Sequence, residues 1–138
     1  MLARDGLPRT LARLVLGAFL LAAGVAHLAR PEPFAAQVPP WLPVDVELVV
    51  LVSGLVEIVL GAAVLLAPRA VRPAVGLVTA TFFVAVFPGN VAQYVEGRDA
   101  FGLRTDAARL IRLAFQPLLV LWAWWALGAS RAVRRSRS

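Results

Sequence analysis

Long uncharged, apolar runs dominate the chain, and charged residues separate one run from the next. Each run is close to the ~20 residues that a helix needs to cross a ~30 Å hydrocarbon core. The runs are continuously apolar and lack the alternation of membrane-barrel strands. The pattern therefore predicts an all-α, polytopic membrane protein, a four-transmembrane-helix bundle in which 1–138 form a single membrane domain. The predicted spans are 11–29, 48–68, 73–95 and 113–130.

Composition supports a membrane protein. Of the 138 residues, 60% are hydrophobic and 16% are charged, with a mean hydropathy of +0.78. Soluble domains contain about 45 to 50% apolar and about 25% charged residues. One alternative for the first run is a cleavable signal peptide, because Arg4 and Arg9 precede it and Gly24-Val25-Ala26 offers small residues for cleavage. The length of that run and the three runs after it favour a membrane span.

The charges indicate topology. Every basic residue is an arginine, and the formal net charge is +6. The arginines lie in connections and tails, which is not typical of a nucleic-acid-binding face. They are more numerous on the side of both termini, so a multi-pass protein of the inner (cytoplasmic) membrane with both termini in the cytoplasm is predicted. We expect a frayed basic C-terminal tail over 131–138 and a short amphipathic surface helix over 98–112.

Several kinds of chemistry are excluded by residue counts. The chain has no cysteine, which excludes disulfides, thiol catalysis and iron-sulfur clusters. His27 is the only histidine, so neither bis-His haem ligation nor a His-rich metal site is expected. No metal, haem or iron-sulfur cofactor is therefore predicted.

Glu57 is the sharpest exception to the apolar pattern, because it lies near the middle of the second run. A lone charge at the centre of a membrane helix costs about 2.5 to 3.5 kcal/mol, so this carboxyl group should be neutral or paired and should avoid lipid. Ser53, Gly54 and Gly61 share its helix face and leave room for another helix or a ligand. Two interpretations stay open: a functional site, or a buried acid that holds helices together.

The other polar residues inside the runs converge on one half of the membrane. With an inside N-terminus, the first and third runs point outward and the fourth points inward. Five polar residues then fall near the outer ends of their helices: His27, Asn90, Gln93, Arg112 and Gln116. A compact bundle brings them together around or just above Glu57. Pro88 and Pro117 are expected to leave backbone carbonyls without helical partners in the same region.

The first outer loop, 30–45, is rich in proline and also contains Phe34 and Trp41. Proline stiffens a loop and removes backbone donors, so the segment can lie at the membrane interface at low entropic cost. We expect it either to cover the polar cluster as a lid or to serve only as an aromatic-anchored interfacial loop.

Four segments in this order resemble the DoxX-like family of small four-helix bacterial membrane proteins. They are AHLARPEPFAAQVPPWLP (26–43), SGLVEIVLG (53–61), FPGNVA (87–92) and RLAFQ (112–116). The family pattern maps onto His27, Pro31, Pro39, Ser53, Gly54, Glu57, Pro88, Asn90, Arg112 and Gln116. The chain departs from it at Leu28, Gly89, Ala114 and Pro117. The resemblance implies the architecture and, through the family's namesake, a link to quinone-dependent redox enzymes.

The predicted function is that of a membrane subunit that binds a small amphipathic molecule, such as a quinone, in the outer half of the bundle. The chain has no redox group, so a redox partner protein would carry the electrons. The alternatives are a scaffold or assembly factor locked by a buried Glu57–Arg112 pair, and proton-coupled export, which the lack of an acid in the first span disfavours. The predicted ligand-binding residues are His27, Trp41, Ser53, Glu57, Asn90, Arg112 and Gln116.

Overall fold

The computed structural model describes residues 6–35, 38, 41–88, 91 and 105–137. Within these residues the fold is all-helical, as predicted. In chain order the helices are α1 (Leu7–Ala29), α2 (Glu32–Ala35), α3 (Val46–Leu66), α4 (Arg72–Ala85), α6 (Asp106–Leu127) and α7 (Ser130–Ser136).

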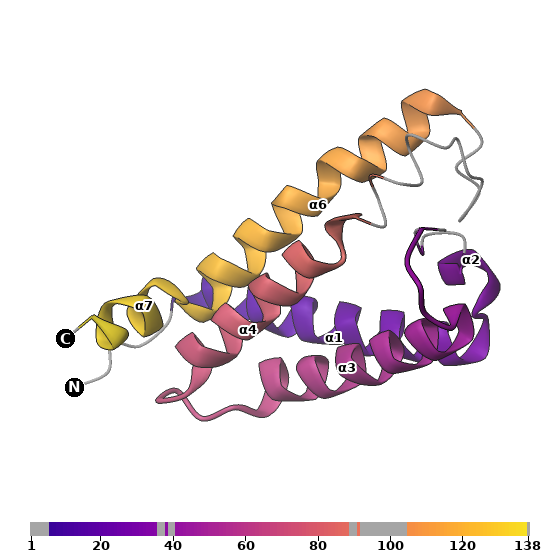
Figure 1. Ribbon diagram of the computed structural model, residues 1–138. Coiled ribbons are helices and arrows are strands. Elements are labelled where there is room, and N and C mark those ends of the chain that lie inside the picture. Colours follow the sequence, from indigo (N-terminus) through magenta and orange to yellow (C-terminus); the bar gives the residue numbers. More distant parts are fainter. Residues whose placement is uncertain (1–5, 36–37, 39–40, 89–90, 92–104, 138) are drawn as a thin grey trace.

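The long helices form two antiparallel pairs (Figure 1). Helix α1 packs along α3, and α4 packs along α6. The pairs meet at the end of the molecule that carries α7 and the start of α1. Toward the opposite end, where α2 lies, α6 diverges from α1 and α3 (Figure 1). The molecule therefore has one closed end and one open end.

Glycines allow α1 and α3 to approach at backbone distance. A Cβ atom added to Gly24 would lie 2.7 Å from the carbonyl oxygen of Gly54, and one added to Gly61 would lie 2.9 Å from that of Gly17. The paired glycines are seven residues apart on each helix, so they recur on one face. Small residues of this kind let membrane helices pack closely. His27 lies on the same buried face of α1.

The closed end is held by side chains that bond to the backbone of a neighbouring helix. Arg13 of α1 is buried and donates hydrogen bonds from Nη1 to the carbonyls of Val64 and Leu65, at 2.8 and 2.9 Å. It thereby satisfies carbonyls in the last turn of α3 that have no partner within that helix. Trp122 of α6 donates from Nε1 to the carbonyl of Ala12 at 2.9 Å, which ties α6 to α1.

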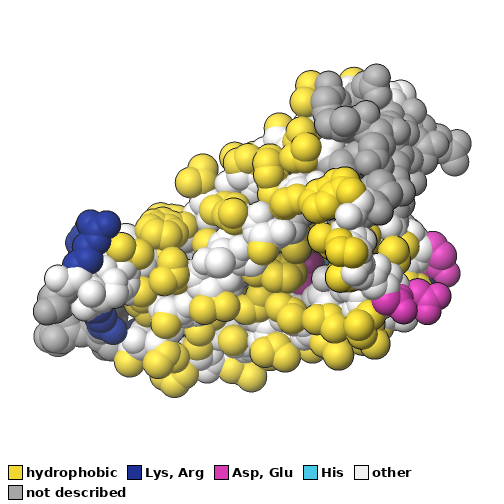
Figure 2. Space-filling model, in the orientation of Figure 1, with side chains coloured by type: hydrophobic (Ala, Val, Ile, Leu, Met, Phe, Trp, Pro, Cys, Tyr) yellow, Lys and Arg dark blue, Asp and Glu magenta, His cyan; other side chains and the backbone are white. Residues whose placement is uncertain are grey.

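Three of the helices are long and apolar enough to cross a membrane. They are Leu7–Ala29, Val46–Leu66 and the Leu110–Leu127 part of α6. Large hydrophobic side chains are exposed along their outer faces. The visible face is mostly apolar between a basic end, near α7, and an acidic end, near α2 (Figure 2). This surface is what a lipid environment favours.

The predicted third span, 73–95, is described only in part: helix α4 is followed by a turn at Val86 and by further helical residues at 87–88 and 91. Helix α4 covers Arg72–Ala85, and Val86 caps it, two residues before Pro88. Proline cannot donate to the carbonyl of Val84 and its ring crowds the preceding turn, which accounts for a break here. At ~1.5 Å per residue, these 14 residues are about 21 Å long. Positions 89–90 and 92–95 lie outside the described residues.

Two local predictions were wrong. The predicted frayed tail, 131–138, is mostly helix α7, which starts after Gly128 ends α6 with a positive φ of 66°. The end of the predicted surface helix 98–112 is instead the start of α6, because Thr105 caps it by accepting a hydrogen bond from the Ala108 amide; residues 98–104 lie outside the described part. Helix α6 continues through Pro117, which has no N–H to donate to the carbonyl of Leu113, as expected.

Candidate functional site

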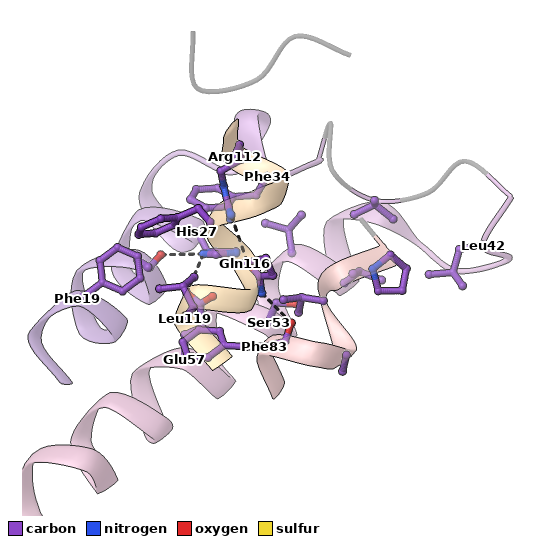
Figure 3. Close-up of a pocket in the computed structure, with 18 of the residues that line it drawn as sticks. Phe19, His27, Phe34, Leu42, Ser53, Glu57, Phe83, Arg112, Gln116 and Leu119 are labelled. Atoms are coloured by element: carbon purple, nitrogen blue, oxygen red, sulfur yellow. Dashed lines mark hydrogen bonds and ion pairs between the residues drawn. The ribbon is translucent and has the colours of Figure 1, made fainter. Parts of the chain in front are cut away.

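A cavity of about 690 Å³ lies at the open end of the bundle, where α6 diverges from α1 and α3. Its wall combines residues from α1, α2, the segment after α2, α3, α4 with the turn that follows, and α6 (Figure 3). Ligand pockets in proteins span about 300 to 1,000 Å³, so the space suits one small molecule. Figure 2 shows an acidic side chain in a hollow among apolar ones at this end.

Six of the seven predicted ligand-binding residues line this cavity. They are His27, Trp41, Ser53, Glu57, Arg112 and Gln116. The seventh, Asn90, lies outside the described residues, as does Gln93. The polar residues thus come from three different long helices and from the segment between α2 and α3. Their convergence follows from the exclusion of polar groups from lipid, whereas their role in binding remains a prediction.

His27 and Glu57 meet on one wall of the cavity (Figure 3). The Nδ1 atom of His27 donates a hydrogen bond to the carbonyl of Ala23 at 2.7 Å, and it lies 3.3 Å from Oε2 of Glu57. Because the carbonyl can only accept, the Nδ1 atom must carry the proton. The imidazole also stacks on Phe34 of α2, with ring centroids 3.6 Å apart. The short helix α2 therefore covers the histidine.

Arg112 and Gln116 form the second polar group, one turn apart on α6. Arg112 donates from Nη1 to Oε1 of Gln116 at 3.2 Å, and Gln116 donates from Nε2 to the carbonyl of Phe83 at 2.7 Å. Gln116 is only 1% exposed, so both of its bonds are shielded from competing solvent. This chain of bonds ties α6 to the end of α4. Arg112 lines the same cavity as Glu57.

The rest of the wall is apolar and aromatic, and the sequence analysis did not identify most of it. The missed aromatic residues include Phe19, Phe83 and Phe115. Helical spacing offered a signal for several of them. Phe19 lies eight residues before His27, and Phe115 and Leu119 flank Gln116 at spacings of one and three. A search for apolar residues that lie on the same helix face as each polar residue, or next to it, would have pointed to this part of the wall.

The arrangement is suited to an amphipathic molecule. Its polar groups are concentrated on His27, Glu57, Arg112 and Gln116, and the remaining walls are mainly hydrocarbon. Such a combination orients a polar head group while the walls bury the apolar body. Among the described residues, no group of three or more His, Asp or Glu side chains could hold a metal ion.

Replacing Gln116 by leucine is expected to lower the free energy of unfolding by about 2 kcal/mol. The change leaves the buried carbonyl of Phe83 without its side-chain donor and Arg112 without its acceptor. Denaturant titration of the purified protein in bicelles would measure the loss. Leu118→Ala, two residues further along α6 at an exposed position, is the matched control. Equal stability of the two variants would contradict a structural role for the Gln116 bonds.

Fold and cavity together define an all-helical protein with three helices able to cross a membrane and an amphipathic pocket at one end. The chain belongs to the family described as domain of unknown function DUF8561, whose model matches residues 16–127. That range contains every residue of the cavity wall. No curated protein and no solved structure matches the chain.

Proposed function

We propose that this protein is a DoxX-like integral membrane protein that binds a small amphipathic molecule, such as a quinone, in the cavity at the open end of the bundle. The observation that carries the proposal is the convergence of His27, Glu57, Arg112 and Gln116 on one cavity with largely apolar walls. A partner protein with a redox group supplies or removes electrons, because the chain itself has no cysteine and only one histidine.

The proposal includes a fourth membrane span that starts with α4, and a lid formed by the segment 30–45. The apolar run 73–95 is long enough for the span. The stacking of Phe34 on His27, and the contribution of Trp41 and Leu42 to the cavity wall, support the lid. The proposal also has both termini in the cytoplasm and the cavity in the outer half of a bacterial inner membrane, which the distribution of arginines supports.

A scaffold or assembly factor is the second candidate. It is favoured by the hydrogen bonds of Arg112 and Gln116, which are made within the protein and link α6 to α4. In that case the polar residues stabilise the bundle and the segment 30–45 docks a client protein. The polar groups would then matter for folding rather than for binding.

Native mass spectrometry on protein purified gently from its native membrane tests the proposal. We expect the wild-type protein to retain a small molecule that Glu57→Gln loses, because the amide replaces one carboxyl oxygen with an NH₂ group that can only donate. Glu47→Gln, the same change at an exposed position in the first turn of α3, should retain the molecule.

The melting temperature of the same samples separates the two candidates. A ligand site requires Glu57→Gln to melt like the wild type while losing the molecule. An empty wild-type cavity, together with a lower melting temperature for Glu57→Gln, would contradict ligand binding and favour the scaffold.

A further inference from the structure

Three donors in the polar part of the cavity are engaged within the protein. The Nδ1–H group of His27 donates a hydrogen bond to the carbonyl of Ala23, and Nε2 of Gln116 donates one to the carbonyl of Phe83. Arg112 donates to Gln116. A guanidinium has five N–H groups, so Arg112 retains capacity, but its bond holds it on the α6 side.

One acceptor is left without a donor. Oε2 of Glu57 is buried and receives no hydrogen bond from any described residue. His27 Nδ1 is only 3.3 Å away, but its single proton points to the carbonyl of Ala23, which is closer at 2.7 Å. The Glu57 side chain is 12% exposed and lines the cavity, so a bound molecule can reach the group to which this oxygen belongs.

Burying an acceptor without a donor is unfavourable, and a ligand that supplies the donor removes that cost. A ligand whose head group has only acceptors, such as a quinone carbonyl, cannot do so at Glu57. A hydroxyl group can.

The walls of the cavity indicate what kind of head group carries the ligand's hydroxyl. Four phenylalanine rings line the cavity: Phe19, Phe34, Phe83 and Phe115. Aromatic rings pack favourably on one another in offset or edge-to-face arrangements, which favours a flat aromatic head group over an aliphatic alcohol.

We propose that the cavity selects a neutral, lipid-soluble phenol, the class that includes the reduced quinols, and that the phenolic hydroxyl donates to the carboxyl group of Glu57. This inference rests on the proposed function, because it names the ligand class of the same cavity. It predicts that the reduced form of a quinone binds more tightly than the oxidised form, since only the reduced form carries hydroxyl donors.

A pair of probes that differ only in the donor tests the proposal. The full-length protein in lipid nanodiscs is equilibrated with 4-octylphenol or with its methyl ether, 4-octylanisole, and empty nanodiscs correct for partition into lipid. We expect the phenol to bind about tenfold more tightly than the ether, the size of effect typical for leaving a buried acceptor unpaired. In Glu57→Gln the preference should shrink markedly, and in Glu47→Gln it should persist.

Each outcome bears on the proposal. Equal binding of the two probes to the wild type would overturn the donor to Glu57 while leaving an amphiphile-binding cavity in place. Binding of neither probe would overturn both this inference and the proposed function. A preference that persists in Glu57→Gln would assign the hydroxyl to a different acceptor. The comparison on the wild type needs no variant, so it holds even if Glu57→Gln fails to fold.

Discussion

Gly24→Val is expected to destabilise the protein by about 3 kcal/mol, the upper end of the usual cost of overpacking. A Cβ atom at this position would lie 2.7 Å from the carbonyl oxygen of Gly54 and 2.9 Å from the amide nitrogen of Ile58. Both are backbone atoms of α3, so they cannot rotate away as a side chain would. The helices must separate, and their contacts weaken along the whole interface.

Denaturant titration in bicelles, followed by circular dichroism, would measure this loss. Ala22→Val is the matched control, because Ala22 is two residues away on α1 and exposed. We expect the control to unfold like the wild type. If Gly24→Val were as stable as Ala22→Val, the close approach of α1 and α3 would be wrong.

Arg13→Leu is expected to cost about 2 to 3 kcal/mol, which is typical for removing hydrogen bonds to a buried charged group. The variant leaves the carbonyls of Val64 and Leu65 without the donors that Arg13 supplies. Arg13→Lys should fall between the wild type and Arg13→Leu, because an ammonium group keeps the charge but lacks the planar fork of guanidinium donors.

The same denaturation experiment measures both variants, with Arg69→Leu as the control. Arg69 is an exposed arginine in the connection between α3 and α4. A loss that was equal for Arg13→Leu and Arg69→Leu would point to a general effect of net charge and would contradict a specific role in capping α3.

The glycine and arginine variants also test whether stability and ligand binding depend on different parts of the bundle. Gly24 packs on α3 and Arg13 holds the closed end, whereas Glu57 borders the cavity at the open end. We therefore expect changes at the first two positions to act on stability and Glu57→Gln to act on binding. This separation is what a ligand site built into a packed scaffold requires.

Much of the fold follows from the apolar runs. A long apolar run in lipid can satisfy its backbone only as a helix, so 11–29, 48–68 and 113–130 predicted α1, α3 and α6 to within a few residues at most ends. The ends were less predictable because they depend on single residues. Thr105 starts α6 earlier than expected, and Gly128 ends it before the charged tail.

The polar residues of the cavity were largely predictable as well, for a related reason. Polar groups such as His27, Glu57 and Gln116 are expelled from lipid and must meet inside the bundle, so their depth along each helix was enough to group them. Phe34 and Trp41 were recognisable from their proline-rich segment. The phenylalanines on the longer helices carried a weaker signal, because helical spacing relates some of them to a polar residue but an aromatic residue in an apolar run is equally suited to face lipid.

Sequence pattern alone thus determined most of the described helices, three of which are able to cross a membrane, and the set of polar residues that come together, because each depends on where apolar and polar side chains are most stable. The hydrogen-bonding partners were decided only in three dimensions. Arg112 donates a hydrogen bond to Gln116 rather than to Glu57. Gln116 donates to the carbonyl of Phe83, and His27 donates to the carbonyl of Ala23. Whether a hydrogen bond forms depends on differences of a fraction of an ångström in the donor–acceptor distance. These distances depend in turn on the angle at which α6 diverges from α1 and α3, and residue spacing in the sequence does not specify that angle.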